Sequence, residues 1–239
     1  MYSTIGVIIP AYNELTNLRI LVPKIASLYP GIKILVVDDS DTLQVGKLKG
    51  FITSQGLAVS VLSRAKKSGR GSAVRDGMAW HMGDNNIRYV IEMDADLAHK
   101  PEEIKNFLAK KDHADLIIGS RYLKKSHIIK WPVRRLIQSR MINFFLRFWL
   151  GLSISDFTNG FRLYSRRAVE ILLKSELKEK GFIALSEMAY LLKRAGCIIK
   201  EIPTTFTDRT YGKSNADVKE LLESLFGAIR IRFRHCIQM

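Results

Sequence analysis

Cysteine is scarce in this chain, which has only Cys197 and Cys236 among its 239 residues. Two widely separated cysteines make neither a disulfide framework nor a cysteine-based metal site, and they fit a reducing compartment. Uncharged apolar runs of 18 residues are also missing, which argues against a membrane-spanning helix. The first residues have the character of a strand and lack the pattern of a secretory signal peptide. These absences predict a globular chain without a transmembrane segment.

Negative charge is also in short supply. The chain has 23 acidic residues against 38 lysines and arginines, a formal net charge of +15 at pH 7. Such an excess favours a polyanionic partner, which is a nucleic acid, an anionic membrane or a phosphorylated substrate. No recognised nucleic-acid-binding motif occurs, and the aromatic residues cluster with aliphatic ones instead of alternating with basic residues. We therefore expect no nucleic-acid partner.

The common glycine-rich nucleotide motifs are absent. Gly69 and Gly71 are not followed by the Gly-Lys-Ser/Thr of a P-loop, and no Gly-x-Gly follows the first predicted strand. This excludes a P-loop ATPase and a standard dinucleotide-binding protein. Internal repeats, low-complexity tracts and linkers are missing too. We expect one domain over residues 1–216 and a C-terminal amphipathic basic helix over 217–239, which either belongs to that domain or contacts a membrane.

Apolar runs alternate with amphipathic segments through the first half of the chain. The patterns predict strands at 4–9, 32–37, 57–62 and 88–93, and helices at 14–28, 42–55, 73–82 and from 101 onward. Regular alternation predicts an α/β fold with a mostly parallel central sheet flanked by helices. The second half is less regular, with strands expected at 115–119, 163–164 and 198–202, helices at 133–152, 166–174, 184–195 and 217–237, and loops at 123–132 and 207–215.

Polar residues follow three of these strands, at 12–14, 38–39 and 94–96. Because the carboxyl ends of parallel strands share one edge of a sheet, where ligands bind, we expect the three clusters to converge. Asp94 and Asp96 would repel each other unless a positive charge lay between them. A divalent cation held by carboxylates and substrate phosphates meets that need. A solvated Asp-x-Asp turn is the alternative for this triplet alone, and the convergence favours a functional site.

Residues 133–152 combine helical character with an unusually apolar composition, and their only charges are arginines. One interpretation is an ordinary core helix. The other is a helix at a membrane interface, with its arginines at the level of the lipid headgroups.

Nine short stretches carry these features in a fixed order: residues 10–14, 38–39, 69–71, 94–101, 119–122, Trp131 with Arg135 and Ser139, 156–162, 186–188 and 209–214. Together they resemble the family 2 glycosyltransferases, and within that family the dolichyl-phosphate (polyprenyl-phosphate) mannose synthase branch. The resemblance covers roughly residues 4–216. It implies a GT-A (Rossmann-like) fold, a divalent metal (Mg²⁺ or Mn²⁺), a nucleotide-sugar donor and a lipid phosphate acceptor.

The resemblance also implies roles for individual residues. Donor binding falls to Pro10, Tyr12, Glu14, Val37, Asp39, Asp94, Ala95, Asp96, Arg209 and Lys213. Metal binding falls to Asp94 and Asp96, and the catalytic set is Asp96, Arg121, Arg135 and Ser139, of which the last three would hold the acceptor phosphate. His99 is expected to have a structural role instead of acting as a base.

The expected reaction is an inverting transfer of a hexose, foremost mannose from GDP-mannose, to a dolichyl or polyprenyl phosphate. The protein would then act peripherally on the cytoplasmic face of a membrane, and the resemblance allows a small membrane subunit as a further partner. A family 2 enzyme with another donor, such as UDP-glucose, or with a non-lipid acceptor is the first alternative. A soluble or polysaccharide acceptor would call for a carboxylate base instead of paired arginines. A non-enzymatic polyanion-binding protein is the remote alternative.

Overall fold

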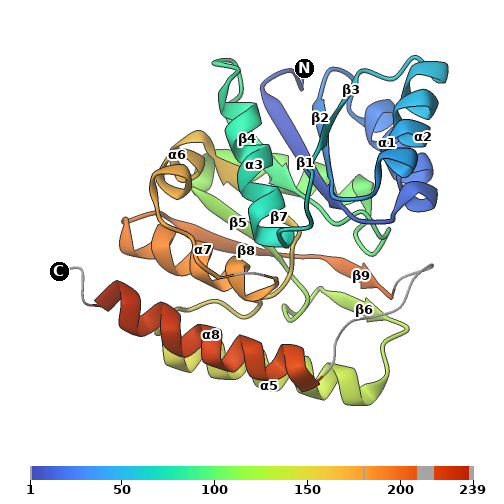
Figure 1. Cartoon of the computed structure of the whole chain (residues 1–239). Helices are drawn as coiled ribbons and strands as arrows, with labels where there is room; N and C mark the ends of the chain where they lie inside the picture. Colours follow the sequence, from blue (N-terminus) through green and yellow to red (C-terminus); the bar gives the residue numbers. More distant parts are fainter. Residues whose placement is uncertain (1, 180, 209–217, 237–239) are drawn as a thin grey trace.

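The computed structural model describes residues 2–179, 181–208 and 218–236, with side chains of the final helix described at 225–234 (Figure 1). A seven-stranded sheet lies at its centre, in the order β3-β2-β1-β4-β7-β5-β8. Its strands are β1 (Ile5–Ala11), β2 (Lys33–Asp38), β3 (Val59–Ser63), β4 (Tyr89–Glu92), β5 (Leu116–Ser120), β7 (Arg162–Ser165) and β8 (Ile199–Pro203). β7 is antiparallel to both β4 and β5, and the other neighbours in the order pair in parallel. The predicted mostly parallel sheet is therefore confirmed.

Helices surround this sheet (Figure 1). They are α1 (Leu15–Leu28), α2 (Thr42–Ser54), α3 (Arg70–Met82), α4 (Ile104–Leu108), α5 (Val133–Leu150), α6 (Arg166–Lys174), α7 (Ile183–Arg194) and α8 (Val218–Cys236). Short 3-10 turns cover Pro101–Glu103 and Lys111–His113. Most predicted elements are confirmed within a few residues at each end.

Two three-residue strands were not predicted. β6 (His127–Ile129) and β9 (Thr205–Thr207) pair in parallel as a separate two-stranded sheet, within or just before segments that the sequence assigns to loops. Strands this short carry too few residues for a period-two pattern to be recognised. They matter for the site because β6 ends two residues before Trp131 and β9 ends directly before Asp208, whose amide donates a hydrogen bond to the carbonyl of Ile129.

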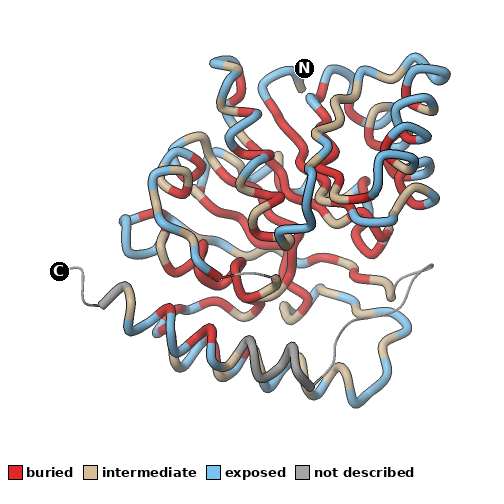
Figure 2. Tube along the Cα trace, viewed as in Figure 1, coloured by how far each residue is buried: buried red, intermediate tan, exposed pale blue. Residues whose placement is uncertain are grey.

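Two apolar layers form the core, one on each face of the sheet. Neighbouring residues of β1 contribute to opposite layers: Ile8 packs in the layer of α3, α6 and α7, whereas Val7 and Ile9 pack in the layer of α1. This alternation is the period-two geometry of a strand that is covered on both sides. Figure 2 shows the result: the central strands of the sheet are buried, and the exposed residues lie on the outer surfaces of the helices, in loops and at the edge strands.

α5 and α8 lie against each other along one side of the molecule, and α8 also contacts α7 (Figure 1). The indole Nε1 of Trp149 donates a 3.0 Å hydrogen bond to the carbonyl of Ala228, which fastens the two helices together. Asn143, Leu146 and Leu150 of α5 are buried. One side of α5 is therefore core, as the first interpretation of this segment required, and its other side remains exposed. Within the described residues, no helix is long and apolar enough to cross a bilayer.

Candidate active site

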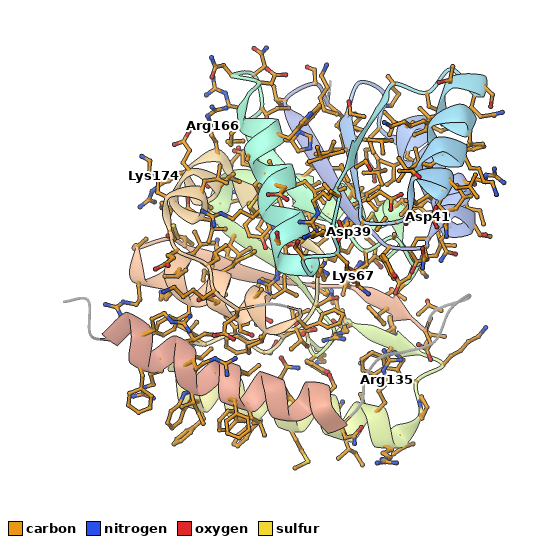
Figure 3. All side chains as sticks on the ribbon, viewed as in Figure 1. Asp39, Asp41, Lys67, Arg135, Arg166 and Lys174 are labelled. Carbon is orange, nitrogen blue, oxygen red and sulfur yellow. The ribbon has the colours of Figure 1, made fainter. Side chains whose placement is uncertain are left out.

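The three polar clusters meet at the carboxyl edge of the sheet, as the strand pattern predicted. Ala11 pairs with Asp38 in the register of β1 and β2, and the Asp39 amide donates to the carbonyl of Ala11. The amide of Asn13 donates a 2.8 Å hydrogen bond to Ser40 Oγ, so the first two clusters touch. Figure 3 labels Asp39 and Lys67 in this region and Arg135 on α5 below it. The remaining cluster joins them through the start of α3.

Arg64 ties Asp39 to α3. Its Nε and Nη2 donate to the two carboxylate oxygens of Asp39, each at 2.6 Å, and its Nη1 donates to Ser72 Oγ and to Asp76 Oδ2, each at 2.9 Å. A two-pronged arginine–carboxylate pair fixes both the position and the plane of the carboxylate. Asp39 is thus held in a fixed orientation at the carboxyl edge of the sheet. The sequence reasoning did not find Arg64.

Four more of the predicted donor residues, Pro10, Tyr12, Glu14 and Val37, lie at or next to the same edge. Tyr12 is 45% exposed, and the Lys67 ammonium lies 3.8 Å from its ring centroid. Glu14 Oε2 accepts a hydrogen bond of 2.5 Å from Asn17 Nδ2. Pro10 and Val37 pair in the register of β1 and β2, next to the carboxyl ends of the two strands. An exposed aromatic ring beside fixed acceptors is a surface on which a nucleobase can pack.

Asp94 and Asp96 follow β4, and neither is a solvated turn residue. Asp94 Oδ1 accepts from Arg70 Nε at 2.9 Å and from Arg70 Nη2 at 2.6 Å. Asp96 is 5% exposed, and its Oδ1 accepts from the amide of Ala98 at 3.1 Å. Directly after Asp96, Leu97 has a φ of +63°, a backbone region that is unfavourable for a residue with a bulky side chain. The turn is therefore strained and held in place by its surroundings, which is common at functional sites.

Arg70 supplies the positive charge beside Asp94. Its Nη1 also donates to Glu92, whose other carboxylate oxygen accepts from Tyr164 at 2.8 Å. Burial alone would lower the pKa of the Arg70 guanidinium, but the charges of Asp94 and Glu92 outweigh burial and raise it. Gly160 leaves the space for this contact, because a Cβ there would lie 2.0 Å from Arg70 Nη2. Arg70 lies in the Gly69–Gly71 stretch, but its contacts with Asp94 and Glu92 were not predicted from the sequence.

Arg121 and Arg135 converge on Trp131. The guanidinium carbon of Arg135 lies 4.1 Å from the Trp131 ring centroid and that of Arg121 lies 5.2 Å from it. Arg135 also forms an ion pair with Asp208 at 2.7 Å. Among the described residues, the buried indole Nε1 of Trp131 has no hydrogen-bond partner. Buried polar atoms of this kind call for an explanation, such as a ligand that completes them.

Arg121 is anchored from behind by Asp156. Arg121 Nε donates to Asp156 Oδ2 at 2.7 Å and Nη2 donates to Oδ1 at 2.8 Å, and Nη2 also donates to Thr158 Oγ1. Burial by itself would raise the pKa of Asp156, but Arg121 reverses this and holds the pKa below its usual range. Among the described residues, the Nη1 group of Arg121 donates no hydrogen bond.

Ser139 lies on α5 one turn after Arg135. Its Oγ accepts a 2.6 Å hydrogen bond from the hydroxyl of Tyr122, the neighbour of Arg121. The structure therefore brings the three predicted acceptor residues into one region. His99 is buried: its Nδ1 lies 3.4 Å from the amide nitrogen of Asp94, and its Nε2 lies 2.8 Å from Asn159 Oδ1. These contacts are those of a residue that positions the Asp94 turn. Arg209 and Lys213 lie outside the described residues.

The donor set of Asp94 and Asp96 suits a hard cation. Among the described residues, no cluster of three or more His, Cys, Asp or Glu side chains is arranged to hold a metal alone. Mg²⁺ and similar ions are commonly bound by one or two carboxylates together with substrate phosphates. Two carboxylates at a strand end fit that arrangement.

The chain belongs to glycosyl transferase family 2, whose family model matches residues 6–173. It is therefore a glycosyltransferase, and the family resemblance of its motifs is confirmed. A polyprenol monophosphomannose synthase of Mycolicibacterium smegmatis is 36% identical over 222 residues, covering 92% of this chain and 83% of the relative. An undecaprenyl-phosphate mannosyltransferase of Micrococcus luteus is 32% identical over 207 residues, covering 87% and 85%.

Solved structures agree on the fold. A glucosyl-3-phosphoglycerate synthase of Mycobacterium tuberculosis, crystallised with Mn²⁺, UDP and glucosyl-3-phosphoglycerate, has a TM-score of 0.66 and 18% identity, covering 98% of this chain and 80% of that one. At this identity the likeness concerns the fold, which is that of the GT-A glycosyltransferases.

Proposed function

We propose that this protein transfers mannose from GDP-mannose to a polyprenyl or dolichyl phosphate, with inversion at the anomeric carbon. Two relatives at 36% and 32% identity carry names that specify a mannosyltransferase acting on a polyprenol or undecaprenyl phosphate. The observation that carries the proposal is the group of donors around Trp131: two arginines and an indole N–H without a described partner. Such a group is suited to the phosphate of an acceptor, because arginine presents several N–H donors in one plane.

We place the nucleotide-sugar donor at the carboxyl ends of β1 and β2, away from the acceptor residues around Trp131. Tyr12 packs against the base, while Glu14 and Asp39 accept hydrogen bonds from base or ribose. Arg64 fixes Asp39 in the required plane through its two-pronged pair. Arg209 and Lys213 are proposed to neutralise the departing diphosphate, on the strength of their place in the family's late motif.

Asp94 and Asp96 would hold the divalent metal, Mg²⁺ or Mn²⁺. When bound, such an ion neutralises charge on the leaving diphosphate. Arg70 and His99 position the two carboxylates, since Arg70 binds Asp94 directly and His99 contacts the amide of the same residue. The protein thus arranges these charges before substrates arrive, which is where most electrostatic catalysis originates.

The acceptor needs no general base. A phosphate monoester has a second pKa of about 6, so most of it is a dianion at neutral pH and already a nucleophile. One of its oxygens forms the bond to the anomeric carbon as the bond from that carbon to the diphosphate oxygen breaks. Arg121, Arg135 and Ser139 orient the acceptor, and positioning of this kind supplies much of the rate. A non-lipid acceptor remains the alternative, and it would call for a carboxylate base instead.

The acceptor's prenyl tail places the reaction at a membrane surface, and we propose peripheral association with the cytoplasmic face. Nothing in the relatives' names supports a small membrane subunit, so the proposal assigns the membrane contact to this chain alone.

Arg135→Ala tests the acceptor assignment. Charged hydrogen bonds are worth about 1.5–3 kcal/mol, so the KM for a short-chain polyprenyl phosphate in detergent should rise, or kcat fall, by roughly tenfold or more. Trp131→Phe keeps the aromatic ring but removes the N–H, and it should produce a smaller loss in the same parameter. Arg134→Ala is the matched control, because Arg134 is the exposed neighbour of Arg135 on α5. If Arg135→Ala weakened binding of the nucleotide sugar and left the kinetics for the polyprenyl phosphate unchanged, the acceptor site would lie elsewhere.

A further inference from the structure

An apolar stripe runs along the exposed side of α5. Five large apolar side chains are exposed there by half or more: Val133 (72%), Ile137 (52%), Met141 (67%), Phe144 (75%) and Phe148 (77%). Their spacings of four, four, three and four residues place them on one side of a helix. Core packing does not account for them, and contiguous exposed apolar surface marks an interaction site.

α8 extends this stripe into a surface. Its exposed apolar residues, Phe226, Ile229 and Phe233, also share one side of the helix. The Phe233 ring lies 6.4 Å from the ring of Trp149, and Arg232 Nη1 donates to the Trp149 carbonyl, so α8 is locked against the end of α5. Figure 3 shows side chains projecting from both helices away from the sheet. The α5–α8 face is defined by Val133, Ile137, Met141, Phe144, Phe148, Phe226, Ile229 and Phe233.

Charge on α5 is of one sign. The helix contains four arginines and no acidic residue. Arg140 and Arg147 are exposed and follow the stripe along one flank. Cations beside an apolar stripe match the interface of an anionic bilayer, where each well-placed cation adds roughly 1 kcal/mol of attraction. A second copy of this chain would instead bring two sets of arginines together.

The inward side of α5 carries the acceptor residues. Arg135 donates a hydrogen bond to Asp208, and Ser139 accepts one from the hydroxyl of Tyr122. Asn143 accepts a hydrogen bond from the amide of Phe157 at 2.6 Å. One helix therefore separates the exposed stripe from the region where the acceptor phosphate would bind. The outer side of α5 is apolar, and its inner side carries hydrogen-bonding side chains that face the proposed acceptor region.

We propose that the α5–α8 face docks on the surface of an anionic bilayer, with Phe144 and Phe148 entering the hydrocarbon boundary and Arg140 and Arg147 at the headgroups. The acceptor site then lies one helix diameter from the lipid, so a prenyl phosphate reaches Trp131 without leaving the membrane. That last consequence rests on the proposed function, whereas the docking itself does not.

Vesicle flotation with the full chain tests the docking. The probe is a vesicle of phosphatidylcholine with phosphatidylglycerol. The double variant Phe144→Ser with Phe148→Ser should bind at least about tenfold more weakly, because two side chains no longer enter the boundary. Ile20→Ser with Leu43→Ser is the matched control on α1 and α2, where the replaced side chains are 49% and 65% exposed, and it should bind like the parent chain. Circular dichroism establishes that both variants are folded.

Activity towards a short-chain polyprenyl phosphate in detergent separates the two proposals. Retention of that activity by the double Phe variant, with loss of vesicle binding, supports docking by this face. Equal vesicle binding by the variant and the parent chain, or no binding by the parent chain, overturns the docking even if sugar transfer occurs. Light scattering that finds the parent chain dimeric and the double Phe variant monomeric would also overturn the docking, since a second copy would then cover the face. Vesicle binding without sugar transfer leaves the docking intact and refutes the proposed function.

Discussion

Arg121 and Asp156 form a buried two-pronged ion pair, with Nε–Oδ2 and Nη2–Oδ1 distances of 2.7 and 2.8 Å. The pair joins the end of β5 to the loop before β7. It therefore ties the acceptor side of the site to the antiparallel strand that interrupts the sheet. Arg121 is therefore anchored by contacts within the protein.

Removing Asp156 should destabilise the fold. Asp156→Ala leaves the Arg121 charge buried without its partner, a change that typically costs about 3–5 kcal/mol of unfolding free energy. Glu170→Ala breaks the more exposed Arg166–Glu170 pair and should cost no more than about 0.5 kcal/mol. Urea denaturation of both variants measures the difference. Equal stabilities would show that the buried pair contributes nothing.

The same pair predicts an acid dependence. Because the pKa of Asp156 is lower in the folded chain than in the unfolded one, its stabilisation is present above the unfolded pKa of about 3.9 and is lost as pH falls through the folded pKa. Asp156→Ala should lack this component of the acid transition.

Asp96→Asn tests the metal assignment. The amide oxygen can still accept from the Ala98 amide, so the fold should persist, whereas the loss of one negative charge should reduce sugar transfer by about a hundredfold or more. Excess EDTA should abolish activity in the parent chain. Asp112→Asn, at the opposite edge of the sheet, is the control and should remain active. Full activity of Asp96→Asn, or of the parent chain in excess EDTA, would refute the metal assignment.

His81 gives a second pH dependence, unrelated to the site. It is fully buried against Gly6 at the centre of the sheet, and burial lowers its pKa from about 6.5 to about 4 despite its contact with the Val7 carbonyl. The unfolded chain therefore binds the proton first, so stability is complete above about pH 6.5 and falls between about 6.5 and 4, by roughly 3 kcal/mol. His81→Asn should lose this slope in pH-dependent denaturation, whereas His127→Asn, an exposed histidine, should keep it. A parent chain with flat stability across that range would contradict the assignment.

Local patterns predicted much of the fold and one edge of the site. Buried strands such as β1 and β2 are continuous apolar runs, and the polar residues that follow them must meet where parallel strands end. The partners of the site residues were not predicted, because they are far apart in the sequence. Arg64 lies 25 positions from Asp39, Arg70 lies 24 positions from Asp94, and Asp156 lies 35 positions from Arg121. No periodicity links residues that far apart. β7 was recognised as a strand, but its antiparallel insertion between β4 and β5 is a property of the assembled sheet.

Transfer of labelled sugar to lipid is the most direct measurement of the central claim. Purified protein is incubated with undecaprenyl phosphate and, in separate reactions, with labelled GDP-mannose, UDP-glucose and other nucleotide sugars, each with Mg²⁺ or Mn²⁺ and with EDTA. The account predicts labelled product in the organic phase from GDP-mannose with metal, and none with EDTA. Product formed only from a UDP-sugar would overturn the donor, and product formed only with a non-lipid acceptor would contradict the central claim.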